Sequence, residues 1–182
     1  ISTGYGLVYY QDVTNGAHQW FTSAASAGSA DATHSFTIPM TIDSSGRVTM
    51  PYQPIFSSNR DTLSYVNVGT AQIIDFTPIV NQGNHWNTST HTFTCPVAGK
   101  YFASFFNITY YGLSSSASSV YIRKNGTQLA IAYQDAPSGS NYHSHGATTV
   151  LNCAANDTID FYCTSGVVYN GMYAGGTIYL IG

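Results

Sequence analysis

Short strand-like runs separated by turn-forming clusters constrain the fold of this chain more than any other feature. The runs are rich in aromatic and β-branched residues, which pack well in sheets. They cover residues 101–109, 119–123, 148–153, 158–163 and 177–181. Clusters of Gly, Asn, Asp and Ser divide them, and no amphipathic helical pattern competes. Strands spaced about 8 to 12 residues apart indicate a sandwich or barrel, so the chain is predicted to be all-β.

One hairpin is predicted together with its turn. Asn125 and Gly126 stand between the apolar runs 120–122 and 129–131. A two-residue turn that fits twisted strands needs positive φ, and Asn and Gly tolerate it best. Cys153 and Cys163 alternate with apolar residues in neighbouring runs, so both are predicted to point inward as core thiols outside any disulfide.

A longer pattern begins at residue 75 and continues through 120–126, 149–161 and 176–182. Its first part combines Asn81, Trp86, Phe93, Pro96, Gly99, Tyr101 and Phe105. The pattern resembles the globular head of the complement C1q and tumour necrosis factor superfamily. The resemblance implies that residues 51–182 form a ten-stranded jelly-roll sandwich. It also implies a homotrimer that binds partners with its exposed end.

Residues 1–50 differ from the rest of the chain. Weak alternation over 6–11, 19–22, 35–38 and 41–49, with a turn at 43–46, predicts β-rich structure that cannot bury a core alone. We expect a shaft or neck in which three chains share one apolar axis. The segment 45–56 resembles the neck-to-head junction of phage tail fibres and related viral structural proteins. Because the chain begins at Ile1 without Met or a signal peptide, we expect the C-terminal piece of a longer fibre in a virion, attached through its N-terminal side and extracellular when it acts.

The amino-acid composition narrows the classes of partner that the chain is expected to bind. Charged residues make up 7% of the chain, against about 25% in average soluble domains, and Glu is absent. A net charge of -3 gives no basic footprint for nucleic acid, and no run of about 18 apolar residues predicts membrane insertion. So few charges suit a secreted or virion protein, or a protomer whose surface is largely covered in an oligomer.

Alternating strand directions divide the loops of a jelly roll between two ends. With the last strand ending near the shaft, loops 109–119, 134–143 and 164–175 lie at the free end, and hairpins 124–128 and 154–157 face the shaft. The free-end loops supply the candidate ligand-binding residues Tyr110, Tyr111, Tyr142, Tyr169, Asn170 and Tyr173. Tyr among Ser, Gly and Asn is typical of binding loops, because Tyr gives rigid contact area at low entropy cost. The alternative is that these Tyr side chains only cap sheet edges and loops.

His143 and His145 are the candidate metal ligands. Residues two apart on a strand share a face, so three chains around an axis would present six imidazoles. Six nitrogens can satisfy an octahedral transition metal such as iron. The alternative is a pair of solvent-exposed or hydrogen-bonded histidines. Calcium, which the resemblance also suggests, is less favoured because Asp135 is the one carboxylate at the free end.

Enzymatic activity is not expected. Glycan hydrolysis needs paired carboxylates, whereas the Asp residues are scattered and no Glu exists; a Gly-x-Ser-x-Gly elbow and a phosphate loop are also absent. The sequence favours a non-catalytic receptor-binding head of a trimeric phage or viral tail fibre that attaches to a host cell-surface glycan or protein. Two alternatives remain: a structural trimerisation or decoration module of a virion, and a cellular adhesin or lectin-like head.

Overall fold

The structure is a computed structural model, and it confirms the all-β prediction. It describes residues 5–24, 35–60, 66–68, 72–110, 118–134, 142–168 and 171–182, with side chains over 5–24, 35–59, 73–108, 119–133, 143–164 and 173–182. Within these residues, no helix has the length and apolar character to cross a membrane. The chain divides into two units, Ile1–Gln53 and Pro54–Gly182, three residues beyond the predicted boundary.

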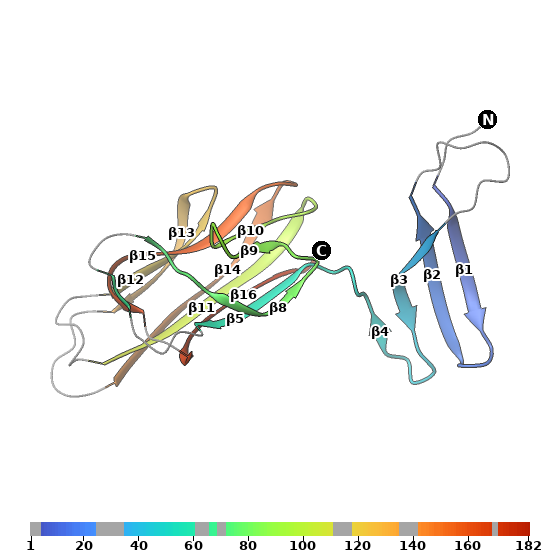
Figure 1. Cartoon of the computed structure of the whole chain (residues 1–182), viewed down its shortest axis with the longest axis horizontal. Helices are drawn as coiled ribbons and strands as arrows, with labels where there is room; N and C mark the ends of the chain where they lie inside the picture. The colour runs from blue at the N-terminus through green and yellow to red at the C-terminus, as the bar shows by residue number, and fades with distance from the viewer. Residues whose placement is uncertain are drawn as a thin grey trace. The chain divides into compact units, whose positions relative to one another are not determined.

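The N-terminal unit is one antiparallel sheet in the order β1-β2-β3-β4 (Figure 1). Its strands are β1 (Leu7–Asp12), β2 (Ala17–Ser23), β3 (Phe36–Ile42) and β4 (Val48–Thr49). The β3–β4 turn forms where predicted: the Asp43 carboxylate accepts hydrogen bonds from the backbone N–H groups of Ser45 and Arg47, and Gly46 takes a φ of 77°. The described residues of this unit form a single layer, which leaves apolar side chains of both sheet faces exposed.

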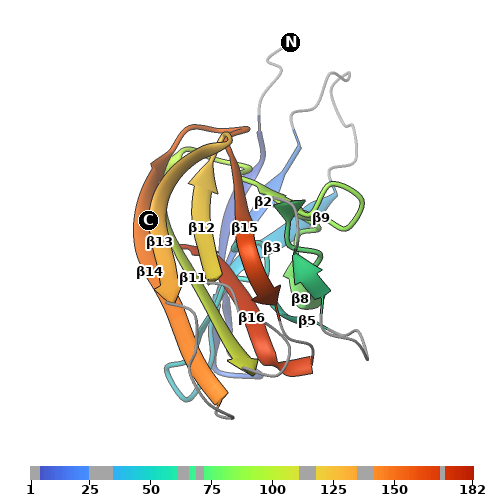
Figure 2. The same cartoon turned by 90° about the vertical axis from the view of Figure 1, so that its left-hand side faces the viewer.

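The C-terminal unit consists of two facing sheets (Figures 1 and 2). The five-stranded sheet has the order β14-β11-β16-β5-β8, with bounds β14 (Tyr142–Cys153), β11 (Gly99–Tyr110), β16 (Gly171–Leu180), β5 (Ile55–Arg60) and β8 (Thr77–Gln82). The second sheet follows the path β13-β12-β15-β10-β9, with bounds β13 (Thr127–Gln134), β12 (Ser118–Lys124), β15 (Thr158–Val168), β10 (Thr92–Thr94) and β9 (Trp86–Asn87). These ten strands form the predicted jelly roll. In the described residues, β6 (Val66–Val68) and β7 (Gln72–Ile73) add short pairings along β15.

Aromatic rings between the two sheets form the core. Phe161 on β15 lies at its centre, with ring centroids 5.5 Å from Phe76, 5.9 Å from Phe105 and 6.4 Å from Trp86. Phe56 stacks on Trp86 at 4.0 Å. Alternate residues of each strand face this core, so the runs rich in aromatic residues are the strands themselves. The aromatic contacts thereby fix how the two sheets face each other.

Two local predictions are confirmed. Asn125 and Gly126 form the β12–β13 turn with φ values of 51° and 76°. Cys153 and Cys163 are buried thiols that form no disulfide, and Cys95 is a third. Burial raises the pKa of Cys95 far above that of an ordinary thiol and also raises the pKa of Cys153, so neither is poised as a nucleophile.

Candidate functional site

The predicted free end is built from the ends of three long strands. Tyr110, the last residue of β11, pairs with Tyr142, the first residue of β14. Tyr173 lies near the start of β16 and is 43% exposed. Alternation along β16 directs Tyr173 to the same side as Tyr179, away from the buried Ala174. The register therefore brings Tyr110, Tyr142 and the start of β16 to one end of the head.

The structure covers only part of the predicted binding set. Tyr111, Tyr169 and Asn170 lie outside the described residues, as does Asp135, and of Tyr110 and Tyr142 only the backbone is described. The assignment of this end as a ligand site thus stays a prediction. This end of the head lies opposite the point where the chain enters it. The strand order causes this, because Ile55 at the start of β5 pairs with Tyr179 at the far end of β16.

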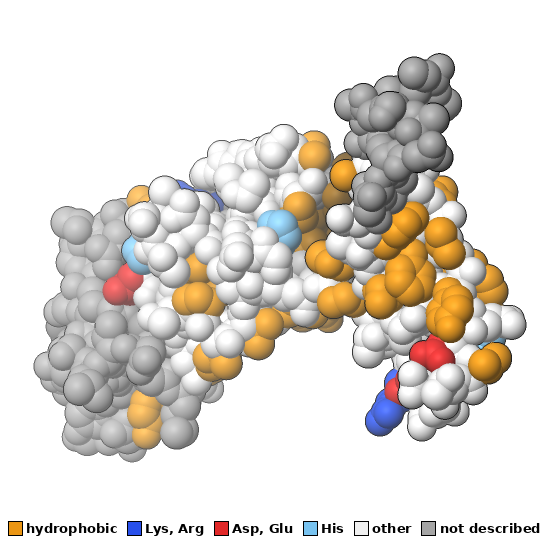
Figure 3. Space-filling model, turned by 45° about the vertical axis from the view of Figure 1, so that its right-hand side comes forward, with side chains coloured by type: hydrophobic (Ala, Val, Ile, Leu, Met, Phe, Trp, Pro, Cys, Tyr) orange, Lys and Arg blue, Asp and Glu red, His pale blue; other side chains and the backbone are white. Residues whose placement is uncertain are grey.

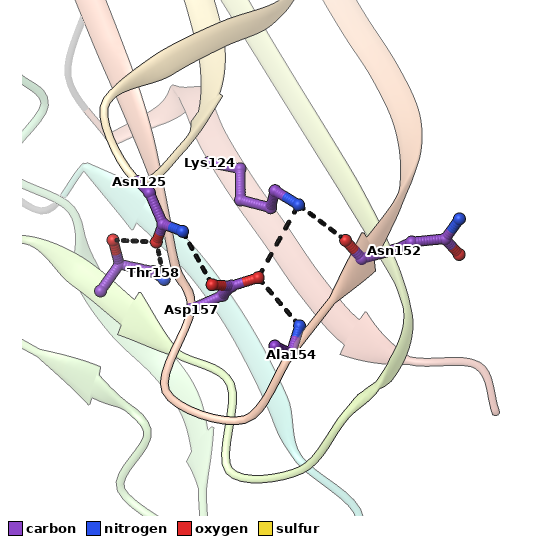
Figure 4. A network of polar contacts seen from close by, with 6 residues as sticks. All are labelled: Lys124, Asn125, Asn152, Ala154, Asp157 and Thr158. Atoms are coloured by element: carbon purple, nitrogen blue, oxygen red, sulfur yellow. Dashed lines mark hydrogen bonds and ion pairs between the residues drawn. The ribbon is translucent and has the colours of Figure 1, made fainter.

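The opposite end of the head is tied together by polar contacts between two turns (Figure 4). The Asp157 carboxylate accepts a hydrogen bond of 2.7 Å from the Asn125 side-chain amide and one of 2.8 Å from the Ala154 N–H. The Asn125 side-chain oxygen in turn accepts the backbone N–H of Thr158 at 2.8 Å, and Lys124 Nζ donates to the Asn152 carbonyl oxygen at 2.9 Å. The hydrogen bond from Asn125, followed by that from Ala154, lowers the pKa of Asp157. These side chains are engaged in holding turns, which is a structural role.

His143 and His145 share one face of β14, as their spacing predicts, and this is the face directed toward the second sheet. The His145 ring lies edge-on to Phe105, with centroids 6.3 Å apart, and burial lowers the pKa of His145 to about 4. The imidazole is therefore neutral at physiological pH, the state that a metal ligand requires. Within the described parts of the chain, no three His, Cys, Asp or Glu side chains come together to hold an ion. An ion shared by several chains, as predicted, would require these side chains to turn away from the space between the sheets, and its presence stays a prediction.

The outer face of the five-stranded sheet is a second candidate surface. Next to the pair Lys100 and Asn152, one row across the strands is apolar and contains Val150, Phe102, Tyr179 and Ile55. The next row carries hydroxyl groups on Thr148, Ser104, Thr177 and Ser57. Neither row contains a charged side chain. Phe102 stacks on Tyr179 with ring centroids 4.9 Å apart, and Val150 is 55% exposed.

Glycines shape the third row of this face. Phe106, 45% exposed, is paired on its two sides with Gly146 and Gly175. A Cβ at Gly175 would come within 2.6 Å of the Ser58 carbonyl oxygen and would also strike the Phe106 ring. The absence of side chains thus lets the ring lie over β16. Lys100, at the end of this face, is its charged side chain among the described residues of β11, and the rows between it and the glycines are uncharged. Partly aromatic rows of this kind are typical of a subunit interface, which is depleted of charge at its centre.

Sequence reasoning missed this outer face. The signal was present in β11, where Tyr101, Ala103 and Phe105 face the core while Phe102 and Phe106 lie on the opposite side. A strand with apolar residues on both faces indicates that both faces are covered. Interpreting this run only through its core-facing side chains left the apolar side chains on its outer side unrecognised.

The geometry first defines a class of protein, a two-sheet jelly-roll head whose outer sheet face carries uncharged aromatic and hydroxyl rows. A family model described as "C1q domain" matches residues 55–178, and the chain belongs to the C1q domain family. The solved globular domain of zebrafish complement 1qA is 20% identical and matches with a TM-score of 0.57 over 71% of this chain and 98% of that one. The Eiger TNF of S. frugiperda is 15% identical, with a TM-score of 0.58 over 71% and 93% of the two chains. The comparison with curated proteins found no match.

Murine APRIL extends the likeness to a more distant structure. It is 9% identical and has a TM-score of 0.54 over 71% of this chain and 99% of that one. At these identities the three structures support the fold. The fold resemblance inferred from residues 75–105 and the later strands is thereby confirmed for the C-terminal unit.

Proposed function

We propose that this protein is a non-catalytic, homotrimeric receptor-binding head of a phage or viral tail fibre that attaches to a host cell-surface glycan or protein. The observation that carries the proposal is the position of the Tyr-bearing strand ends. Tyr110, Tyr142 and Tyr173 belong to the end of the head away from the start of β5, so a fibre joined before Pro54 would present them outward. The virion context rests on the resemblance of segment 45–56 to neck-to-head junctions.

Trimer formation is supported by the outer face of the five-stranded sheet. Its aromatic and hydroxyl rows carry no charge, and the family to which the chain belongs often forms trimeric binding heads. Covering this face would remove Phe102, Phe106 and Val150 from water, each contributing about 1 to 3 kcal/mol when fully buried. In a monomer this apolar face would stay exposed to water and would favour aggregation.

A charge placed on this face tests the trimer. In Thr177→Arg the guanidinium would be buried without a partner, at a cost of several kcal/mol for each of three copies, so the trimer should dissociate or fail to form. The matched control is Thr94→Arg, on the outer side of the other sheet, which should keep the mass of the native assembly. Light scattering measures the mass of the assembly and distinguishes the two variants. A native chain with the 19.6 kDa mass of one copy at micromolar concentration would overturn the trimer.

Replacing three Tyr residues tests receptor binding. The variant Tyr110→Ala, Tyr142→Ala, Tyr169→Ala should lose binding to host cells, because each lost aromatic anchor can remove about 2 kcal/mol and three heads amplify the loss through avidity. The trimer mass and melting temperature should stay close to native values. The control is Gln128→Ala, an exposed residue at the opposite end, which leaves the network of Asn125 and Asp157 intact. Binding lost in the control but kept in the Tyr variant would place recognition elsewhere on the head.

A further inference from the structure

The N-terminal sheet has two faces of different chemistry. On one face Val8, Tyr10, Phe21 and Phe36 enclose an apolar groove of about 310 Å³. Tyr10 and Phe21 meet there edge to face, with ring centroids 6.3 Å apart. Val8 is 45% and Tyr10 49% exposed, so the groove is open to solvent in one copy of the chain.

The other face combines aromatic rings with hydrogen-bonded polar groups and with Leu7, which is 76% exposed. Tyr9 packs against Trp20, with ring centroids 5.3 Å apart, and its hydroxyl hydrogen-bonds to His18 Nδ1. The Gln11 side chain donates a hydrogen bond of 3.1 Å to the same hydroxyl. Aromatic rings whose polar groups are bonded tolerate water better than the purely apolar groove does. The groove face differs from this one in that its apolar side chains surround a hollow that another layer can fill.

Charge does not oppose contact between copies. The charged side chains described in this unit are Asp12, Asp43 and Arg47, and all three lie at strand ends or in turns. Asp43 and Arg47 form an ion pair with each other at 2.7 Å. In Figure 3 hydrophobic side chains gather on a face of this sheet, and the red and blue side chains lie at its end. Identical groove faces can therefore meet without bringing like charges together.

The short connection between the N-terminal sheet and the head identifies the partner of the groove face as another copy of the same sheet. Residues 50–54 alone link β4 to β5 of the head. Once three heads assemble, this short tether holds three N-terminal sheets at an effective concentration of the order of mM. A single-layer sheet must bury an apolar face against another layer, and the sheets of neighbouring copies are then the most concentrated apolar surface available.

We propose that the Val8, Tyr10, Phe21 and Phe36 face packs against the same face of the other copies around a common axis, while the Tyr9, His18 and Trp20 face points outward. This assignment rests on the homotrimer of the proposed function and specifies which side of the N-terminal sheet closes it. The N-terminal unit is thus a second assembly module that needs the heads to bring it together.

Cysteine labelling of the full chain tests the assignment. Val8→Cys places a thiol on the groove face, and Leu7→Cys places one on the outward face at a position that is 76% exposed. The native cysteines Cys95, Cys153 and Cys163 are at most 6% exposed and give a low background. With a maleimide reagent on the folded protein, Val8→Cys should react at least tenfold more slowly than Leu7→Cys.

Light scattering on the same samples separates the possible failures. Equal labelling rates in a trimer would overturn the face assignment and leave the proposed function standing. A monomeric mass would overturn both. Protection of Val8→Cys in a monomer would show that another segment of the same chain covers the groove. Protection that requires added particle proteins would show that a different protein covers it. Either result also overturns the proposal.

Discussion

Acidification should destabilise the head through His145. Burial against Phe105 lowers the pKa of this imidazole to about 4 in the folded chain, whereas the unfolded chain titrates near its ordinary value of 6.5. Between these two values the unfolded state binds a proton that the folded state excludes, so stability falls as the pH falls from 6.5 to 4. One pKa unit corresponds to about 1.4 kcal/mol, and partial exposure of the ring reduces the full difference to about 2 to 3 kcal/mol per chain.

Urea denaturation at about pH 7 and about pH 4.5, at one fixed chain concentration, measures this loss. His145→Gln removes the titrating group while keeping a polar side chain of similar size, and it should remove about 2 kcal/mol of the pH dependence. His85→Gln is the matched comparison, because burial also lowers the pKa of His85, at a different place in the head. Asp157 does not interfere, since the lowered pKa of its carboxyl places its contribution below this window. Equal pH dependence in the native chain and His145→Gln would refute the argument from burial.

Two further predictions concern the core and the metal. Phe161→Ala should cost about 3 to 5 kcal/mol in the free energy of unfolding, because three other rings lose their central contact, while Ile131→Ala, on an exposed strand, should cost less than about 1 kcal/mol in the same denaturation assay. One transition-metal ion per trimer at His143 and His145 should appear in elemental analysis of untagged protein and should raise the melting temperature by mass action. Metal content well below one per three chains, with no effect of a chelator on melting, would exclude the ion.

Strand cores were predictable from the sequence and strand ends were not. The run 148–153 marks only half of β14, because His143, Ser144 and Gly146 have weak strand preference and are held by pairing with β11. Gly-rich β16 is a further case. Gly176 lies so close to Phe161 that an added Cβ would approach the ring within 2.6 Å, so the sheet needs glycine where propensity argues against a strand. Both extensions depend on partners distant in sequence.

The candidate sites were likewise predictable only in part from the sequence. The shared face of His143 and His145 follows from a period of two, which any strand imposes. The direction of that face, toward the second sheet, depends on which neighbours β14 meets. The outer face of the five-stranded sheet was missed for a related reason: alternation identifies a buried face but does not tell how many faces a strand buries.

The strand order brings the beginning of β5 and the end of β16 together at one end of the head. The Leu180 N–H donates to the Pro54 carbonyl oxygen at 3.2 Å, and the Lys100 N–H donates to the Gly182 carbonyl oxygen at 2.7 Å. The first strand of the head thus begins beside the end of its last strand. Residues 54–182 could therefore be exchanged as one folded unit without altering the N-terminal sheet.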